Sequence, residues 1–201
     1  IVVNADFKMR NNEMMTWEEL EKQCVNCSWC KLSYTRNNVV FGVGDRNADI
    51  MFVGEGPGEQ EDLKDEPFVG AAGKLLDDML SIIDLDRSNV YIANIVKCRP
   101  PNNRDPQPEE EDSCIGFLMN QIALVRPKIL VCLGRVAAKR LIREDFRVTA
   151  EHGKWFEKNG IWYMGTYHPS ALLRDTQKRP EAFMDLLEIR NKGKELNCKN
   201  S

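Results

Sequence analysis

Hydrophobic and polar positions follow two different periods along the chain, and the changes of period predict its elements. Four short apolar segments rich in β-branched and aromatic residues are typical of buried strands: residues 49–54, 90–95, 128–133 and 161–167. Around them, apolar residues recur at helical spacing, which predicts helices over 16–23, 71–83, 109–125, 135–143 and 180–190. Strands that alternate with helices indicate parallel pairing in a sheet covered on both faces. The sequence therefore predicts an α/β fold, a three-layer α/β/α sandwich around a central four-stranded parallel sheet.

Length and composition fit one ordinary globular domain over residues 1–201, with residues 1–15 and 191–201 expected to be disordered tails. No apolar run approaches the roughly 20 residues that span a bilayer. The N-terminus also lacks the apolar core of a signal peptide. We therefore expect a cytoplasmic monomer with no membrane contact. The net charge of −3 does not indicate a nucleic-acid binder, although an enzyme that contacts a few phosphates needs only a local basic rim.

Unusual residues gather where the predicted strands end. In parallel sheets, ligands bind beyond the carboxyl ends of the strands. This rule selects residues 54–61, 94–104, 134–136 and 168–174. Asn94 ends the second strand and His168 follows the fourth, and an aromatic residue, Phe68, lies just before a helix. Each has a structural alternative: Asn94 bonded to backbone, Phe68 in the core, and His168 in a structural role.

A glycine-rich loop, Gly54-Glu55-Gly56-Pro57-Gly58, follows the first predicted strand. Glycines let the backbone approach a ligand closely. The loop has neither the Lys-Ser/Thr of a phosphate loop nor the dinucleotide fingerprint. Its acidic residues, which include Glu61 further on, suit activation of water or stabilisation of a cation better than phosphate binding. A tight turn with solvated acids is the alternative.

The chain has seven cysteines, an odd number that argues against a disulfide framework in a reducing compartment. Cys24, Cys27 and Cys30 form two overlapping C-x2-C pairs, and Cys98 and Cys114 follow much later. Four cysteines can ligate zinc or a [4Fe–4S] cluster. The spacing does not decide between these, and buried structural cysteines are a third interpretation.

Together these stretches resemble the family-4 uracil-DNA glycosylases, the iron–sulfur branch of the uracil-DNA glycosylase superfamily. The matching segments are Cys27-x-x-Cys30-x-Leu32-x-x-x-Arg36, Val39-Val40-Phe41-Gly42, Gly54-Glu55-Gly56-Pro57-Gly58, Pro67-Phe68-Val69-Gly70, Tyr91-Ile92-Ala93-Asn94, Lys97-Cys98-Arg99-Pro100-Pro101 and His168-Pro169-Ser170. Each motif alone is weak, but the set is specific in this order and spacing.

The resemblance implies a uracil-DNA glycosylase-like fold and an enzyme of base excision repair. Such an enzyme flips uracil out of single- or double-stranded DNA and hydrolyses its N-glycosidic bond, which leaves an abasic site. The resemblance also implies a [4Fe–4S] cluster of structural role held by Cys27, Cys30, Cys98 and Cys114, with Cys24 as an additional upstream residue.

The family's roles map onto the strand-end residues. The implied uracil-binding residues are Gly56, Glu61, Phe68, Asn94 and His168. Phe68 would stack on the base, Asn94 would bind its Watson–Crick edge, and Glu61 would crowd the C5 carbon and so exclude thymine.

Two catalytic residues and a DNA wedge complete the implied site. His168 would donate a hydrogen bond to the developing charge on the uracil carbonyl oxygen, and Glu55 would position the attacking water. Leu172, Leu173 and Arg174 resemble the wedge that fills the vacated base stack and contacts a phosphate.

Two other interpretations stay open. Relatives in the superfamily capture uracil covalently or act on other deaminated bases, but the covalent type has a Gln where this loop has Gly56, and residues 175–179 contain no His. A non-catalytic iron–sulfur or zinc protein that binds nucleic acid or a partner is the alternative from a different class.

Overall fold

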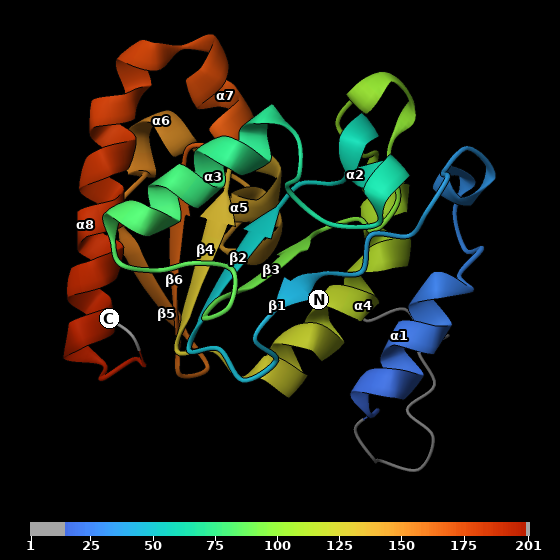
Figure 1. Ribbon diagram of the computed structural model, residues 1–201, viewed down its shortest axis with the longest axis horizontal. Helices are drawn as coiled ribbons and strands as arrows, with labels where there is room; N and C mark the ends of the chain where they lie inside the picture. Colours follow the sequence, from blue (N-terminus) through green and yellow to red (C-terminus); the bar gives the residue numbers. More distant parts are fainter. Residues whose placement is uncertain (1–14, 200–201) are drawn as a thin grey trace.

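The computed structural model describes residues 15–199, which form one mixed sheet flanked by helices (Figure 1). The sheet has the strand order β1-β3-β2-β4-β6-β5. The strands are β1 (Val43–Gly44), β2 (Ile50–Gly54), β3 (Tyr91–Asn94), β4 (Ile129–Leu133), β5 (Trp155–Lys158) and β6 (Ile161–Thr166). The four central strands β3, β2, β4 and β6 pair in parallel, whereas β1 and β5 pair antiparallel at the two edges.

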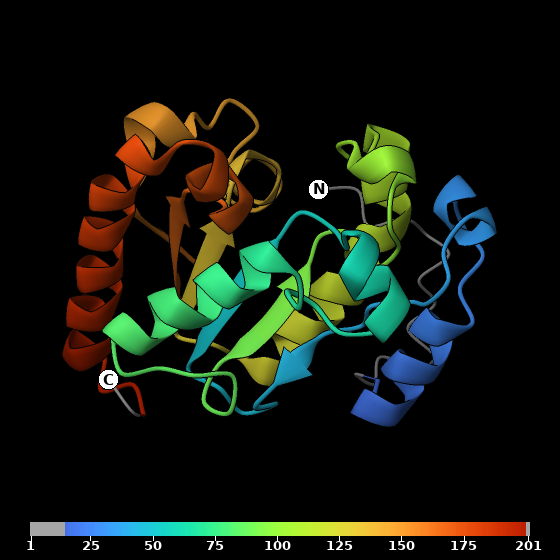
Figure 2. The ribbon, with the colours of Figure 1, turned by 45° about the horizontal axis from the view of Figure 1, so that its top comes forward.

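Helices cover both faces of the sheet, as Figures 1 and 2 show. They are α1 (Trp17–Val25), α2 (Glu59–Lys64), α3 (Ala71–Ile82), α4 (Pro108–Val125), α5 (Arg135–Leu141), α6 (Val148–Glu151), α7 (Pro169–Arg174) and α8 (Arg179–Glu195), with short 3-10 turns at η2 (Lys31–Tyr34), η3 (Pro101–Asn103) and η4 (Thr176–Lys178). The predicted three-layer α/β/α sandwich is confirmed.

Alternate residues of each strand enter separate cores on the two faces. In β2, Met51 and Val53 pack into the core that includes residues of α1, α4 and α5, whereas Ile50 and Phe52 pack against α3 and α8. This follows from the two-residue period of a strand. Because both faces are covered, all five residues of β2 are buried.

Local sequence sets the helix starts. The Thr16 hydroxyl accepts a hydrogen bond from the Glu19 backbone N–H, and the Glu19 carboxylate accepts one from Thr16, which forms a capping box for α1. Helix α4 begins at Pro108, as the missing N–H of proline favours at that position.

The predicted four-stranded parallel sheet forms the centre of the observed sheet, and β1 and β5 extend it at the two edges. The sequence did not indicate these two strands, because β1 is only two residues long and β5 is half-exposed, so neither has a clear apolar pattern. The expected tail from residue 191 is instead the end of α8 up to Glu195, followed by a buried Cys198. At the other end, Met15 packs against the core, and the remaining residues of the expected N-terminal tail lie outside the described part of the chain.

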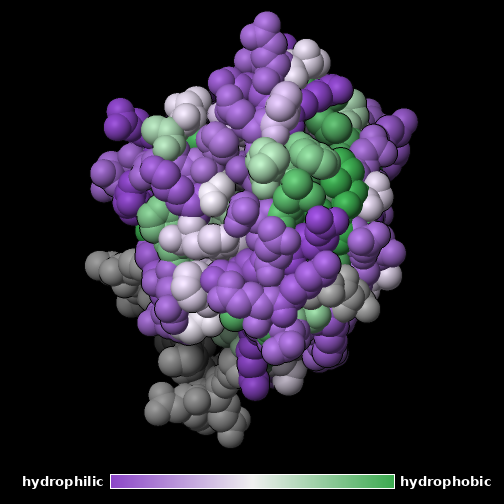
Figure 3. Space-filling view, turned by 90° about the vertical axis from the view of Figure 1, so that its left-hand side faces the viewer, coloured by the Kyte–Doolittle hydropathy of each residue, from purple (hydrophilic) through white to green (hydrophobic). Residues whose placement is uncertain are grey.

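Polar side chains dominate the face of the molecule on the α8 side, which carries one smaller hydrophobic patch (Figure 3). Phe183 and Met184 of α8 are among the exposed apolar residues. Within residues 15–199, no helix combines the length and the apolar character that crossing a membrane requires.

Candidate active site

Strand register brings the predicted residues to one edge of the sheet. Gly54 at the end of β2 pairs with Asn94 at the end of β3, and Leu133 of β4 pairs with Thr166 of β6. The glycine loop, Asn94 and the segment with His168 therefore leave the same carboxyl edge, where parallel sheets bind ligands.

Asn94 and Phe68 converge on the first glycine of the loop. A Cβ atom on Gly54 would lie 2.5 Å from Asn94 Oδ1 and 2.6 Å from Phe68 Cζ, so only glycine fits between them. Asn94 is 2% exposed, and its Oδ1 has no hydrogen-bond partner among residues 15–199. An unpaired buried acceptor costs roughly 1–3 kcal/mol, so Asn94 is suited to a ligand that donates a hydrogen bond.

The backbone of Phe68 is strained. Its φ is +56°, in the left-handed region that a bulky residue rarely adopts and that costs of order 1–3 kcal/mol. The ring is buried and lies 5.6 Å from the His168 ring, centroid to centroid, at 31°. The strained backbone therefore presents a flat apolar surface beside Asn94 and His168.

His168 caps the short helix α7 and is held in one tautomer. Its Nδ1 accepts a hydrogen bond from the Ser170 backbone N–H at 3.1 Å, and the Ser170 hydroxyl lies 2.8 Å away. Since Nδ1 accepts, the proton of the neutral ring is on Nε2. Burial, with a smaller effect from Arg174, lowers the pKa of His168 to about 4 against the opposing effect of Glu61. At neutral pH His168 is therefore an uncharged Nε2–H donor.

Glu61 binds the backbone of the two residues that follow Phe68 in the sequence. Its Oε1 accepts hydrogen bonds from the N–H groups of Val69 at 2.9 Å and Gly70 at 2.8 Å. Both N–H groups lie at the start of α3, where a carboxylate also interacts favourably with the helix dipole. Glu61 thus has a structural function in the segment that carries Phe68, and crowding of a base at C5 stays a prediction.

The carboxyl group of Glu55 has a raised pKa, which the sequence did not indicate. Burial, followed by the neighbouring carboxylate of Asp105, raises the pKa of Glu55 to about 7, and Arg135 opposes this effect. Arg135 also forms an ion pair with Asp105. Asp105 lies fifty residues from Glu55 and in no recognisable motif, so only the folded chain identifies it.

The second glycine of the loop packs against the segment that follows β3. A Cβ atom on Gly56 would lie 2.7 Å from Val96 Cγ2. The Val96 N–H also donates to the Glu55 carbonyl oxygen at 3.1 Å. The glycine loop is therefore joined to the segment after Asn94, and contact of Gly56 with uracil stays a prediction.

The predicted DNA wedge is only partly exposed. Leu173 is 41% exposed and Arg174 is also exposed, but Leu172 is 1% exposed and belongs to the core on the α8 face. Of the three predicted wedge residues, Leu173 and Arg174 are therefore exposed and Leu172 is not. Consecutive residues of a helix point in different directions, so only one of the two leucines of α7 can face solvent fully.

Five cysteines line one cavity beside this site. The cavity is bounded by Cys24, Cys27, Trp29, Cys30, Leu32, Ser33, Arg36, Lys97, Cys98, Ser113, Cys114 and Phe117. Arg36 Nη1 donates to Cys98 Sγ at 3.2 Å, and the Lys97 backbone N–H donates to Cys114 Sγ at 3.3 Å. Burial raises the pKa of the Cys114 thiol to about 12, so a thiolate there needs positive charge nearby.

The cavity also changes the interpretation of Cys24. The sequence suggested an additional residue upstream of the ligands, whereas Cys24 is fully buried and lines the same cavity. Within residues 15–199, no three His, Cys, Asp or Glu side chains are grouped in a way that could hold a single metal ion.

A buried amide, an aromatic ring and a neutral histidine thus lie together at the carboxyl edge of this α/β sheet. The family model of the uracil DNA glycosylase superfamily matches residues 41–189.

Individual relatives narrow the class. A type-4 uracil-DNA glycosylase of Archaeoglobus fulgidus is 44% identical over 184 residues, which cover 88% of this chain and 92% of the relative. The type-4 enzyme of Sulfurisphaera tokodaii is 44% identical over 88% of this chain and 84% of its own length, and that of Thermotoga maritima is 43% identical over 81% and 88%. The chain therefore belongs to the uracil-DNA glycosylase superfamily and, within it, to the type-4 branch.

Proposed function

We propose that this protein removes uracil from DNA by flipping the nucleotide into the pocket and hydrolysing its N-glycosidic bond. The observation that carries the proposal is the unpaired Oδ1 of Asn94, buried beside Phe68. Uracil presents an N3–H donor next to its O4 acceptor, which matches the Oδ1 acceptor and Nδ2 donor of an amide. Cytosine has these two functions reversed and would leave both amide groups unpaired, so the pocket rejects it.

Phe68 and His168 complete the recognition of the base. The buried ring of Phe68 provides a stacking surface, which is worth about 1–3 kcal/mol for a base. His168 offers its Nε2–H to uracil O2. When the C1′–N1 bond breaks, its electron pair moves onto the uracil ring and O2 gains negative charge. A neutral donor placed there stabilises the leaving anion by very roughly 3 kcal/mol.

Glu55 is the residue we assign to the water. The water oxygen adds to the cation-like C1′ of the sugar and its proton passes to Glu55, which must be ionised at that moment. A pKa of about 7 allows an ionised fraction at neutral pH and also makes the carboxylate a capable proton acceptor. The products are free uracil and an abasic site.

Contacts with DNA are assigned to Leu173 and Arg174. Leu173 is exposed on α7, directly after the segment with His168, so it is suited to fill the space left by the flipped base. The exposed Arg174 is suited to a phosphate. Leu172 supports this helix from the core rather than contacting DNA.

We further propose that Cys27, Cys30, Cys98 and Cys114 hold a [4Fe–4S] cluster. Two cationic side chains, Arg36 and Lys97, line the same cavity and would offset part of the negative charge of four thiolates. Each thiolate of such a cluster binds a different iron, so its ligands do not have to surround one ion as zinc ligands do. A bound cluster would have a structural role, because it would tie the segment after β3 to α4 and to the segment before η2.

The expected cytoplasmic location and monomeric state stay predictions.

Incubation with oligonucleotides tests the proposal. Single- and double-stranded substrates containing one uracil should be cut by alkali after incubation, whereas matched substrates with cytosine or thymine should stay intact. Brown, folded protein that yields no cleavage of the uracil substrates would contradict the glycosylase proposal. Cleavage of substrates with other deaminated bases would assign a broader activity.

A further inference from the structure

One arginine outside the pocket contacts the strained segment that carries Phe68. Arg87 lies in the turn between α3 and β3, and its Nη1 donates to the Pro67 carbonyl oxygen at 2.9 Å. Its Nη2 donates to the carbonyl oxygen of Phe68 itself. A guanidinium has a rigid fork of donors, so one side chain can fix two successive carbonyl groups.

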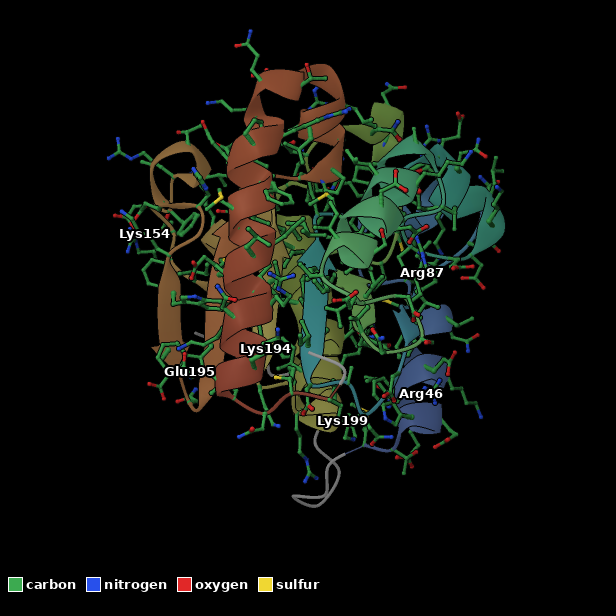
Figure 4. The ribbon with its side chains drawn as sticks, turned by 60° about the vertical axis from the view of Figure 1, so that its left-hand side comes forward. Arg46, Arg87, Lys154, Lys194, Glu195 and Lys199 are labelled. Carbon is green, nitrogen blue, oxygen red and sulfur yellow. The ribbon has the colours of Figure 1, made fainter. Side chains whose placement is uncertain are left out.

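Arg87 is itself held from two further directions. Asp77 Oδ1, on α3, accepts from its Nε at 2.7 Å, and Glu66 Oε1 lies 3.2 Å from its Nη1. The Arg87 side chain is only 23% exposed. Figure 4 shows Arg87 on the same side of the molecule as Arg46, which lies below it beside α1. The two carboxylates therefore restrict the guanidinium to the orientation that reaches the carbonyl groups.

The turn before β3 gives this side chain a rigid base. Asp86 Oδ1 accepts hydrogen bonds from the backbone N–H of Ser88 at 2.7 Å and from its hydroxyl at 2.5 Å. The Asn89 side chain accepts from the Asp86 N–H at 3.0 Å. Both flanks of Arg87 are thus fixed by local side-chain hydrogen bonds.

The Phe68 carbonyl group, which Arg87 binds, is also in close contact with α3. Gly73, in the first turns of α3, approaches so closely that a Cβ atom there would lie 1.7 Å from the Phe68 carbonyl oxygen. A backbone in the left-handed region persists only where its surroundings determine it. Arg87, Gly73 and Glu61 together supply those surroundings.

We infer that Arg87 is a positioning residue for base recognition, which fixes the Phe68 backbone so that its ring is ready to stack on the flipped base. The inference rests on the proposed function, since it concerns the uracil pocket. Arg87 itself does not contact the base. Its effect on uracil therefore passes through Phe68 and should vanish when the Phe68 ring is absent.

A double-mutant cycle tests the inference. Wild-type protein, Arg87→Lys, Phe68→Ala and the double variant are compared for kcat and KM on a uracil-containing oligonucleotide, and for inhibition by free uracil. Lysine keeps the charge but has no fork to hold both carbonyl groups. Arg87→Lys should raise KM and the inhibition constant of uracil about tenfold, as expected for one lost charged hydrogen bond, with a smaller change in kcat. In the Phe68→Ala background the same change should be less than about twofold.

Arg46→Lys is the matched control. Arg46 forms an ion pair with Glu21 at 2.8 Å and lies over the Trp17 ring, so its contacts belong to α1 and its replacement should leave KM unchanged. If Arg87→Lys does not fold, Asp77→Ala keeps the arginine, removes the acceptor of its Nε, and should give a smaller shift in the same direction.

Two results would overturn the inference. One is unchanged KM and unchanged uracil inhibition in Arg87→Lys, and the other is an equal loss with and without the Phe68 ring. Either would leave Arg87 as a stabilising contact of the fold. Wild-type protein that releases no uracil would instead refute the proposed function.

Discussion

Asn94, at the end of β3, and His168, just after β6, lie at the same carboxyl edge of the sheet, yet their backbones are supported in different ways. On the β3 side, the buried Lys97 donates from Nζ to the Asn94 carbonyl oxygen at 3.0 Å and to Gln121 Oε1 at 2.6 Å. Lys97 and the adjacent Cys98 also line the cysteine cavity. The residue that reads the base is therefore one hydrogen bond away from the proposed cluster site.

The segment from β6 to His168, residues 166–168, is supported by protein side chains and not by the proposed cluster site. Thr166, two residues before His168, donates its hydroxyl proton to Asp185 Oδ2 at 2.5 Å, and His152 Nδ1 lies 2.9 Å from Asp185 Oδ1. The next residue, Tyr167, bonds through its hydroxyl to Glu181 of α8. His152 is thus part of a polar network around a buried carboxylate.

Asn94 and His168 would therefore be held in position by two different means. If the cysteines hold a cluster, the order of the β3 side depends on a group that is not part of the polypeptide. The order of the β6 side depends on a buried carboxylate and its donors, which assemble as the chain folds. The two sides should therefore respond differently to loss of iron, to substitution and to pH.

The largest expected effect comes from Cys98→Ala. Loss of one ligand should abolish the brown absorption and lower the free energy of unfolding by about 4 kcal/mol or more, the range for a lost metal site. Hydrogen exchange should increase in residues 94–98 more than in residues 166–168. Cys132→Ala, at a buried cysteine of β4 outside the cavity, is the control and should keep the colour. Iron retained in Cys98→Ala, or zinc without iron in the wild type, would contradict the cluster assignment.

His168→Ala should lower the rate of the reaction and leave the folded structure unchanged. Removing the Nε2–H donor should lower kcat about 100- to 1000-fold, the usual effect of losing one such donor. The visible absorption should be unchanged, because His168 does not line the cysteine cavity. His152→Ala is the matched histidine variant and should keep kcat within about tenfold. Unchanged turnover in His168→Ala would exclude this residue from the mechanism.

Asp185→Ala should break the β6 network alone. Thr166 and His152 would lose their acceptor, which should lower the free energy of unfolding by about 2 to 3 kcal/mol. The smaller change Thr166→Val, which removes one hydroxyl, should cost about 1 kcal/mol. Denaturant unfolding measures both, and iron content should stay at the wild-type level. Equal loss of iron in Asp185→Ala would show that the two sides are not independent.

The same contrast explains what could be predicted from the sequence. The sequence predicts that Asn94 and His168 lie near each other, because one ends and the other follows a strong apolar strand, and the carboxyl ends of such strands meet at one edge. It does not indicate the roles of Arg87, Lys97 and Asp185, since each acts through a contact with a residue distant in the sequence or through burial that no local pattern reports. Nor does it indicate that Leu172 is buried, because a two-leucine motif does not specify which side chain faces solvent.

The smallest expected effect is a pH dependence that distinguishes Glu55 from His168. With a pKa near 4, His168 stays neutral from pH 5 to 8 and gives no transition there. Glu55, with a pKa near 7, is ionised to about one-tenth at pH 6 and about nine-tenths at pH 8, so kcat should rise roughly tenfold over this range. Its raised pKa also means that the folded state binds this proton more tightly than the unfolded state. Its contribution to stability therefore falls as the pH rises from about 4.5 through 7.

Asp105→Asn separates the carboxylate pair from other causes of that pH dependence. Because the Asp105 charge raises the pKa of Glu55, its removal should move the transition in kcat to lower pH while the maximum rate is kept. Glu55→Gln should lower the rate and flatten the profile. A profile that stays the same in both variants would assign the transition to another group, and Glu55 would lose its role with the water. A profile that flattens in Glu55→Gln but not in Asp105→Asn would assign the titrating proton to Glu55, which follows β2. His168, which follows β6, would then act throughout this pH range as an uncharged donor in a fixed position.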